Sequence, residues 1–183
     1  MKEMYVIHEE LEFIVVVKSS GLLSVPGRGP ENLDCVSERV KALYPGCIEQ
    51  PSVHRLDMDT SGLLVVARTK QSHRNISIQF QDSKVTKRYI AILDGEVDCD
   101  NGTIELPFRV DIDNRPHQIY DTVHGKVGIT HWKKILVKDG RTRIEFTPIT
   151  GRTHQLRVHS ASEHGLNIPI VGDPLYGTGT GPG

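Results

Sequence analysis

The sequence predicts an α+β fold whose core is a mostly antiparallel, mixed β-sheet with flanking helices. Several runs rich in β-branched residues are bounded by Gly, Pro, Asp or Ser, which is typical of short strands. In the region 102–146 such runs follow one another with only short turns between them, and this favours antiparallel pairing over repeated βαβ units. Other segments carry apolar residues at helical spacing, and these supply the helices.

The first half of the chain predicts two buried strands and two helices. The run Glu-Phe-Ile-Val-Val-Val-Lys predicts a strand because it is β-branched and ends at Ser-Ser-Gly, whereas Ser24–Pro30 is a loop by its Gly and Pro content. Val36, Val40 and Leu43 fall on one helical face, and Thr69 is placed to cap the second helix. The expected elements are a strand over 12–18, a helix over 34–44, a strand over 63–67 and a helix over 71–81.

The second half predicts a series of strands and one last helix. The strands are bounded by Gly, Asp and Pro, and the helix is ended by His164-Gly165. The tail, Gly177–Gly183, is expected to be too flexible to order itself. The expected strands are 88–93, 103–106, 118–123, 128–137 and 142–147, and the expected helix is 153–163.

Composition and charge indicate a globular protein and exclude several classes. The chain has 183 residues and a net charge of −1, so no global positive field points to nucleic acid, although charge can be concentrated locally. Its three cysteines form no C-x-x-C pair, which argues against a disulfide framework and a thiolate zinc site. The acidic N-terminus is no signal peptide, and Phe13–Val17 is far shorter than the ~20 residues of a membrane span. We therefore expect a single domain over residues 1–183 in a reducing compartment, with no membrane partner.

The densest polar run is His54–Gly62, which leads directly into the second buried strand. Polar residues on a loop held against a rigid sheet are a common catalytic arrangement. Asp57 can serve as a nucleophile, a general base or a metal ligand, or it can form a turn that feeds the strand. Asp57 and Asp59 can also form the acid–base pair of a hydrolase, but two residues this close need not share a face on a loop. The His-Arg-Leu-Asp order is similar to a kinase catalytic loop, yet no Gly-rich loop precedes it and the chain is too short for that fold.

A second polar cluster, Ile149–His159, opens the last helix. His154 and His159 lack the i, i+4 spacing that places two imidazoles on one helix face for zinc, so we expect no metal site. Arg152 and Arg157 are suited to pairing with a carboxylate or phosphate through the guanidinium fork, or else they lie at an exposed helix end.

Basic residues are concentrated between Arg68 and Arg88, where six lysines or arginines stand against Asp82 alone. Such a local excess suits an RNA phosphate backbone, but a solvated helix face gives the same pattern. A smaller cluster, Asn114–Gln118, lies between two predicted strands and is either an RNA-facing loop or a turn.

Taken in order, these segments resemble the RluA-type family of RNA pseudouridine synthases. The resemblance covers residues 8–177, and its two long blocks are highly specific in combination. The matching segments are Gly21–Gly27 (GLLSVPG), His54–Ala67 (HRLDMDTSGLLVVA), Lys87–Tyr89 (KRY), Asn114–Pro116 (NRP), Thr150–His159 (TGRTHQLRVH) and Gly172-Asp173.

The resemblance implies that the chain isomerises a uridine in RNA: the N-glycosidic bond breaks, the uracil turns, and C5 rejoins C1′. It implies that Asp57 is the catalytic carboxylate, attacking either C1′ or the uracil ring, and that Arg157 pairs with Asp57 and keeps it ionised. Tyr89 would stack on the target uracil, and Arg55 would fill the gap left when the uridine flips out. No metal or organic cofactor is needed. The further substrate-binding residues are expected to be His54, Lys70, Lys87, Arg88, Arg115 and Arg152.

The resemblance also implies a structured RNA substrate, namely a tRNA anticodon stem-loop, 23S ribosomal RNA or both, and we expect a cytoplasmic monomer. The family continues beyond Gly-Asp-x-x-Tyr with a further strand, so we expect a catalytic domain truncated after about residue 176, without an S4 domain. Lys18-Ser-Ser-Gly replaces the usual Lys-Pro-x-Gly of the family. The alternative is a catalytically silent RNA-binding module of the same fold, although Asp57, Tyr89 and Arg157 are all present.

Overall fold

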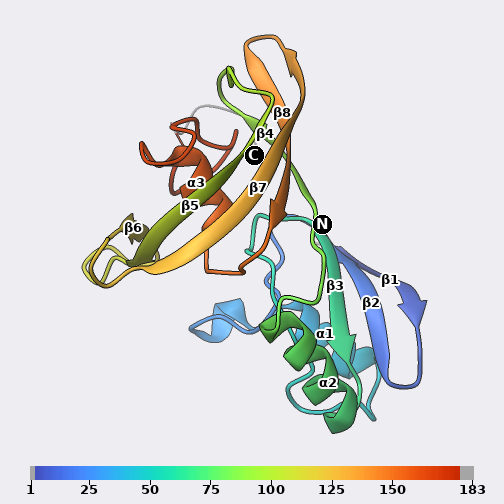
Figure 1. Ribbon diagram of the computed structural model, residues 1–183. Coiled ribbons are helices and arrows are strands. Elements are labelled where there is room, and N and C mark those ends of the chain that lie inside the picture. The colour runs from blue at the N-terminus through green and yellow to red at the C-terminus, as the bar shows by residue number, and fades with distance from the viewer. Residues whose placement is uncertain (1–2, 178–183) are drawn as a thin grey trace. The chain divides into compact units, whose positions relative to one another are not determined.

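A computed structural model describes residues 3–177 and divides the chain into two compact units, Met1–Val85 and Thr86–Gly183 (Figure 1). The tail that the sequence predicts to be flexible lies, apart from Gly177, outside the described residues. Within the part of the chain that the structure describes, no helix combines the length and apolar character needed to cross a membrane.

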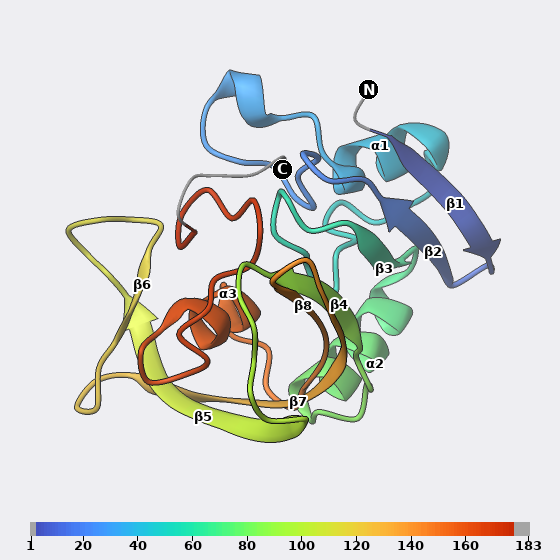
Figure 2. The same cartoon turned by 90° about the horizontal axis from the view of Figure 1, so that it is seen from above.

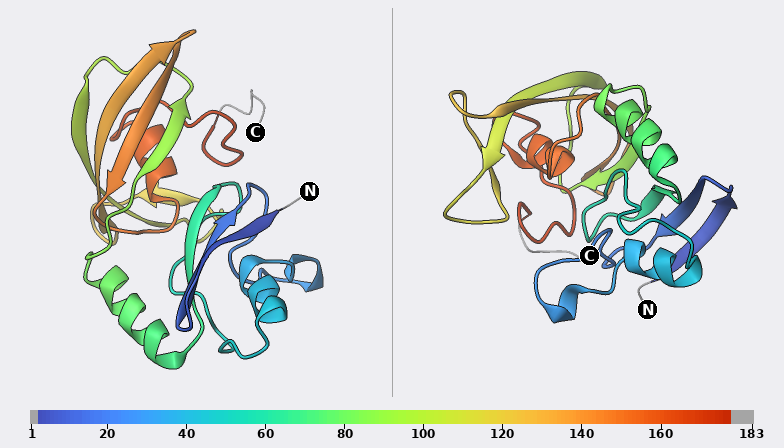
Figure 3. Two further views of the ribbon diagram at one scale, coloured as in Figure 1. Left: turned by 90° about the vertical axis from the view of Figure 1, so that its right-hand side faces the viewer. Right: turned by 90° about the horizontal axis from the view of Figure 1, so that it is seen from below.

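The first unit is built on a three-stranded antiparallel sheet in the order β1-β2-β3 (Figures 1 and 3). Both buried strands and both helices expected in this half are confirmed, with ends that move by one or two residues. The edge strand β1 was not expected, because its side chains are mostly exposed and it carries no buried alternation. The elements are β1 (Met4–Glu9), β2 (Phe13–Lys18), a 3₁₀ turn (Pro30–Asn32), α1 (Val36–Leu43), β3 (Gly62–Ala67) and α2 (Lys70–Gln81).

The core of the first unit follows from alternation along β2 and β3. Ile14 and Val16 of β2 are fully buried and alternate with partly exposed residues, and Leu64 and Val66 of β3 are nearly fully buried on either side of the partly exposed Val65. Val36 and Val40 of α1 are also buried. Helix α2 is capped as expected by Thr69, whose side-chain oxygen accepts the Ser72 N–H at 3.1 Å in a capping box.

The second unit is a five-stranded antiparallel sheet in the order β4-β8-β7-β5-β6, and Figure 2 shows it curving around helix α3. Asp139 and Gly140 both have positive φ, as a tight turn between β7 and β8 requires. The predicted strand 118–123 ends early, because the Asp121 carboxylate accepts the N–H groups of Val123 and His124 and forms a turn. The elements are β4 (Tyr89–Leu93), β5 (Asn101–Val110), β6 (Gln118–Tyr120), β7 (Lys126–Lys138), β8 (Arg141–Pro148) and α3 (Gln155–Ala161).

The core of the second unit lies between the concave face of the sheet and α3. Helix α3 is shorter than the predicted 153–163, because His154 is left-handed (φ 56°) and Ser162 is extended. The buried apolar residues are Leu93, Val97, Ile104, Leu106, Phe108, Trp132, Ile144, Phe146 and Val158. The α+β fold class with antiparallel pairing is therefore confirmed, each unit being one sheet with its own helices.

Candidate functional site

The loop that carries Asp57 is tied down on both sides of the aspartate. On one side, Ser24 bonds the backbone of Leu56 twice, since its Oγ donates to the carbonyl (2.7 Å) and accepts the N–H (3.0 Å). On the other side, the Met58 carbonyl accepts the Lys18 ammonium (2.8 Å) and the Gly21 N–H (2.9 Å). Asp57 itself is half-buried. The Gly21–Gly27 motif thus lies against the Asp57 loop and fixes its backbone.

Lys18 is a fully buried cation at the base of this loop. Its ammonium donates to the carbonyls of Leu22 (2.7 Å), Met58 (2.8 Å) and Ser19 (3.1 Å). Burial lowers the pKa of Lys18 to about 8, while Asp59 and Asp57 act in the opposite direction. Sequence reasoning assigned Lys18 no role, because nothing in the residue order shows that it reaches residues 40 positions away.

Of the other site residues expected in the first unit, Arg55 and Lys70 are exposed, whereas His54 is half-buried. The ring of His54 accepts the Val65 N–H (3.0 Å) and stacks on Phe80 at 4.3 Å between centroids, so this side chain holds strand β3 and helix α2. Arg68 is half-buried and donates to Glu9 (3.2 Å), which removes one cation from the basic stretch.

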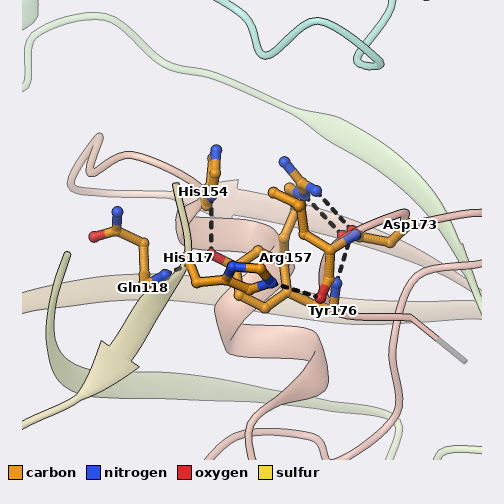
Figure 4. A network of polar contacts seen from close by, with 7 residues as sticks. His117, Gln118, His154, Arg157, Asp173 and Tyr176 are labelled. Carbon is orange, nitrogen blue, oxygen red and sulfur yellow. Dashed lines mark hydrogen bonds and ion pairs between the residues drawn. The ribbon is translucent and has the colours of Figure 1, made fainter. Parts of the chain in front are cut away.

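In the second unit, Tyr89 begins β4 and packs against the apolar core. Arg157 of α3 makes a two-pronged ion pair with Asp173, with its Nε at 2.7 Å and its Nη2 at 2.6 Å from the two carboxylate oxygens (Figure 4). Burial acts to raise the pKa of Asp173, but the Arg157 hydrogen bonds and the N–H groups of Tyr176 and Leu175 hold it below its usual value. The predicted pair of Arg157 with Asp57 joins the two units and stays a prediction.

The segment before α3 is held by the buried side chain of Gln155. Its amide nitrogen donates to the Ile129 carbonyl (3.0 Å) and the Thr130 hydroxyl (2.9 Å). Its carbonyl oxygen accepts the Thr150 hydroxyl (2.7 Å) and the Arg152 N–H (2.9 Å). The Gln155 side chain thus fixes the backbone of the exposed Arg152.

The remaining basic candidates lie on the surface of the second unit or close to it. Arg88 and Arg115 are exposed. Lys87 is half-buried and donates to the Thr150 carbonyl (3.4 Å), and burial lowers its pKa. No cluster of three metal-binding side chains occurs among residues 3–177.

Comparison with known proteins places these motifs in one family. Residues 12–162 match the family model described as RNA pseudouridylate synthase. The chain is 46% identical over 176 residues to the dual-specificity RNA pseudouridine synthase RluA of Yersinia pestis, covering 94% of this chain and 82% of that protein. Its identity to the protein of the same name from Escherichia coli K12 is 41%, covering 93% of this chain and 76% of that protein.

A solved structure agrees with the sequence comparisons. Human RNA pseudouridylate synthase domain containing 1 superposes with a TM-score of 0.76 at 27% identity, covering 96% of this chain and 70% of that one. The family match spans both units and includes Asp57, Tyr89 and Arg157. The chain therefore belongs to the RNA pseudouridylate synthase family and is an isomerase that forms pseudouridine in RNA.

Proposed function

We propose that this synthase modifies uridine in two classes of RNA, a tRNA stem-loop and 23S ribosomal RNA. The observation that carries the proposal is the 40–46% identity to relatives that are named dual-specificity enzymes. Exposed cations at Arg55, Lys70 and Arg88 suit contacts with the phosphate backbone of a stem-loop. We further propose that the protein acts in the cytoplasm as a monomer. Light scattering of the purified protein with and without RNA tests the monomeric state.

In the proposed mechanism Asp57 is the nucleophile. Its carboxylate forms a bond either to C1′ of the ribose or to the uracil ring, and the N1–C1′ bond breaks in the course of the reaction. The uracil turns, C5 bonds to C1′, Asp57 is released, and the C5 proton is lost while N1 gains one, so that no atom is lost or gained overall. The loop held by Lys18 and Ser24 keeps Asp57 in one place through these steps.

The other proposed residues support this chemistry. Arg157 keeps Asp57 ionised, and its ion pair with Asp173 through Nε and Nη2 fixes the position of the guanidinium. Tyr89 stacks on the uracil, and Arg55 fills the gap left by the flipped nucleotide. We propose His54, Lys70, Lys87, Arg88, Arg115 and Arg152 as further substrate-binding residues. The reaction then needs residues of both units, which makes residues 1–183 one catalytic domain.

The test is tritium release from RNA that carries tritium at C5 of uridine. Asp57→Asn removes the charge and nearly all nucleophilicity while keeping the size of the side chain, so we expect no release, unchanged melting and near-normal RNA binding. Asp59→Asn is the matched control, because Asp59 is exposed in the same loop and should retain activity. Substantial turnover by Asp57→Asn contradicts the mechanism, and loss of activity in both variants indicates a carboxylate pair instead.

A further inference from the structure

The turn formed by residues 173–176 connects two segments of the second unit that are far apart in sequence (Figure 4). The Tyr176 hydroxyl accepts the backbone N–H of Gln118 at 2.8 Å. The same hydroxyl lies 2.9 Å from Nδ1 of His154. One phenol therefore bridges the first residue of β6, at the end of the Asn114–Gln118 segment, and the residue that precedes α3.

A second contact fastens the same loop to the same turn. The His117 ring lies between two carbonyl oxygens, with Nδ1 2.9 Å from that of Asn114 and Nε2 3.3 Å from that of Leu175. The His117 ring also meets the Tyr176 ring edge-on at 5.7 Å between centroids. The segment Asn114–Gln118, which carries the exposed Arg115, is thus attached at its C-terminal end to the turn.

The turn is itself rigid, because Asp173 anchors it. The Asp173 carboxylate accepts the N–H groups of Leu175 (2.9 Å) and Tyr176 (3.0 Å) in addition to its two bonds from Arg157. The Arg157 guanidinium also lies 5.1 Å from the centroid of the Tyr176 ring. Tyr176 is therefore held by its backbone and its ring, which leaves its hydroxyl at a defined place.

His154 is the other residue that needs this support. It is a non-glycine residue with φ 56°, a left-handed conformation that persists only when its surroundings hold it. The Tyr176 hydroxyl contacts its ring directly, and the two rings meet edge-on at 5.7 Å. Removing the hydroxyl thus loosens both the Asn114–Gln118 loop and the start of α3.

We propose that Tyr176 is a positioning residue for RNA binding, which fastens the Asn114–Gln118 loop to the start of α3 and so sets the position of Arg115. The inference rests on the proposed function, because Arg115 is a proposed RNA contact. The Tyr176 hydroxyl takes no part in the ion pair that holds Arg157, so its loss should act through the loop rather than on the chemistry at Asp57. Its loss should therefore weaken RNA binding and spare the rate of the bound complex.

The test compares Tyr176→Phe with Tyr120→Phe in the full chain. Tyr176→Phe keeps the ring and removes two hydrogen-bond contacts, so we expect the KM for a tritiated RNA stem-loop to rise by about 5- to 10-fold with kcat within about twofold. Tyr120 is the matched control, because it lies on β6 near the same loop and its hydroxyl has no hydrogen-bond partner among the described residues. Tyr120→Phe should leave both constants unchanged.

Hydrogen exchange of the Gln118 backbone amide measures directly whether Tyr176 holds the Asn114–Gln118 loop. The Gln118 amide should exchange its hydrogen faster in Tyr176→Phe than in the wild type, because its acceptor is gone. Unchanged Gln118 exchange overturns the inference. Faster exchange with an unchanged KM, or a loss confined to kcat, overturns it as well.

A double-mutant cycle separates this inference from the proposed function. Arg115→Ala alone should raise KM, and Tyr176→Phe added to it should raise KM by less than about twofold more, since both changes act through one loop. If Arg115→Ala raises KM and Tyr176→Phe does not, the role of Tyr176 is wrong and the proposed RNA contact stands. If Arg115→Ala leaves KM unchanged, the proposed contact itself is wrong, and the inference falls with it.

Discussion

Two fully buried basic side chains, Lys18 and His159, differ in whether their nitrogen atoms have hydrogen-bond partners. Lys18 has three carbonyl acceptors for its ammonium, and it ties the Asp57 loop to β2. His159 of α3 is equally buried, but both of its ring nitrogens lack a hydrogen-bond partner among the described residues. A neutral imidazole tolerates this position better than a charged one, because burying an unpaired charge costs far more free energy. His159 is therefore a neutral core residue beside Phe108.

The His159 environment predicts that stability falls in mild acid. Burial lowers the pKa of His159 to about 4, from an ordinary value near 6.5 in the unfolded chain. Between these values the unfolded state binds more protons, so the free energy of unfolding decreases as pH falls from about 6.5 to 4. The loss attributable to this residue is about 3 kcal/mol, measurable by urea unfolding at several pH values.

Two variants isolate this contribution from that of the carboxylates. His159→Leu keeps the core apolar and removes the titrating group, so its stability should depend less on pH between about 4 and 6.5. His124→Leu is the control, because His124 is exposed and should keep the full dependence. Equal pH dependence in both variants would show that His159 is not the group responsible.

At the scale of elements, the segment Thr150–Arg152 depends on the side chain of Gln155. The four hydrogen bonds of that amide join α3, the segment before it and β7. We expect Gln155→Leu to lower the free energy of unfolding by about 2–4 kcal/mol, because it leaves several buried polar groups without partners. Urea unfolding measures the loss.

A matched glutamine on the surface provides the comparison for this effect. Gln81 is the last residue of α2 and is exposed, so Gln81→Leu should change stability by less than about 0.5 kcal/mol. If both variants lose the same free energy, the Gln155 network does not carry the stability assigned to it. If Gln155→Leu is also less active at saturating RNA, the position of Arg152 or of α3 affects the bound complex.

Elements with a strong local signal could be predicted from the sequence, and those shaped by tertiary contacts could not. Strands β2 and β3 carry buried β-branched runs, and the Thr69 cap of α2 can be recognised from residues close to it in the sequence. The early end of β6 depends on the Asp121 side chain, and the late start of α3 depends on a left-handed His154. These ends depend on a side-chain hydrogen bond and on a left-handed residue, and a hydrophobic pattern reveals neither.

For the whole molecule, the motifs predicted the family, but not the contacts that hold the candidate site. His54–Ala67 and Thr150–His159 identified the family, and the match over residues 12–162 confirms it. The partners of Asp57's neighbours lie 32 and 40 residues away, so the residue order does not reveal them. Likewise, the sequence shows Arg157 and Asp173 as two charges and gives no sign that they pair.

The charge of the whole molecule leads to a last prediction about salt. The net charge is −1, so attraction to RNA must come from local groups rather than from a global field. Within the basic stretch, Lys84 already pairs with Asp82 (2.9 Å) and Lys87 donates to a carbonyl, whereas Lys70 and Arg88 are exposed. Lys70 and Arg88, together with Arg74, which is also exposed, should therefore supply the larger share of the phosphate contacts, since each contact releases condensed counterions.

We expect Lys70→Ala combined with Arg88→Ala to weaken RNA binding and to flatten its dependence on salt by about two ions, because each lost phosphate contact lowers the slope by roughly one. The measurement is the Kd for an RNA stem-loop, titrated between low and physiological salt. Lys133→Ala combined with Lys138→Ala removes the same charge from exposed positions on β7 and serves as the control. If the two double variants change the slope equally, binding depends only on net charge. If the first changes neither affinity nor slope, the stretch is a solvated surface that RNA does not touch.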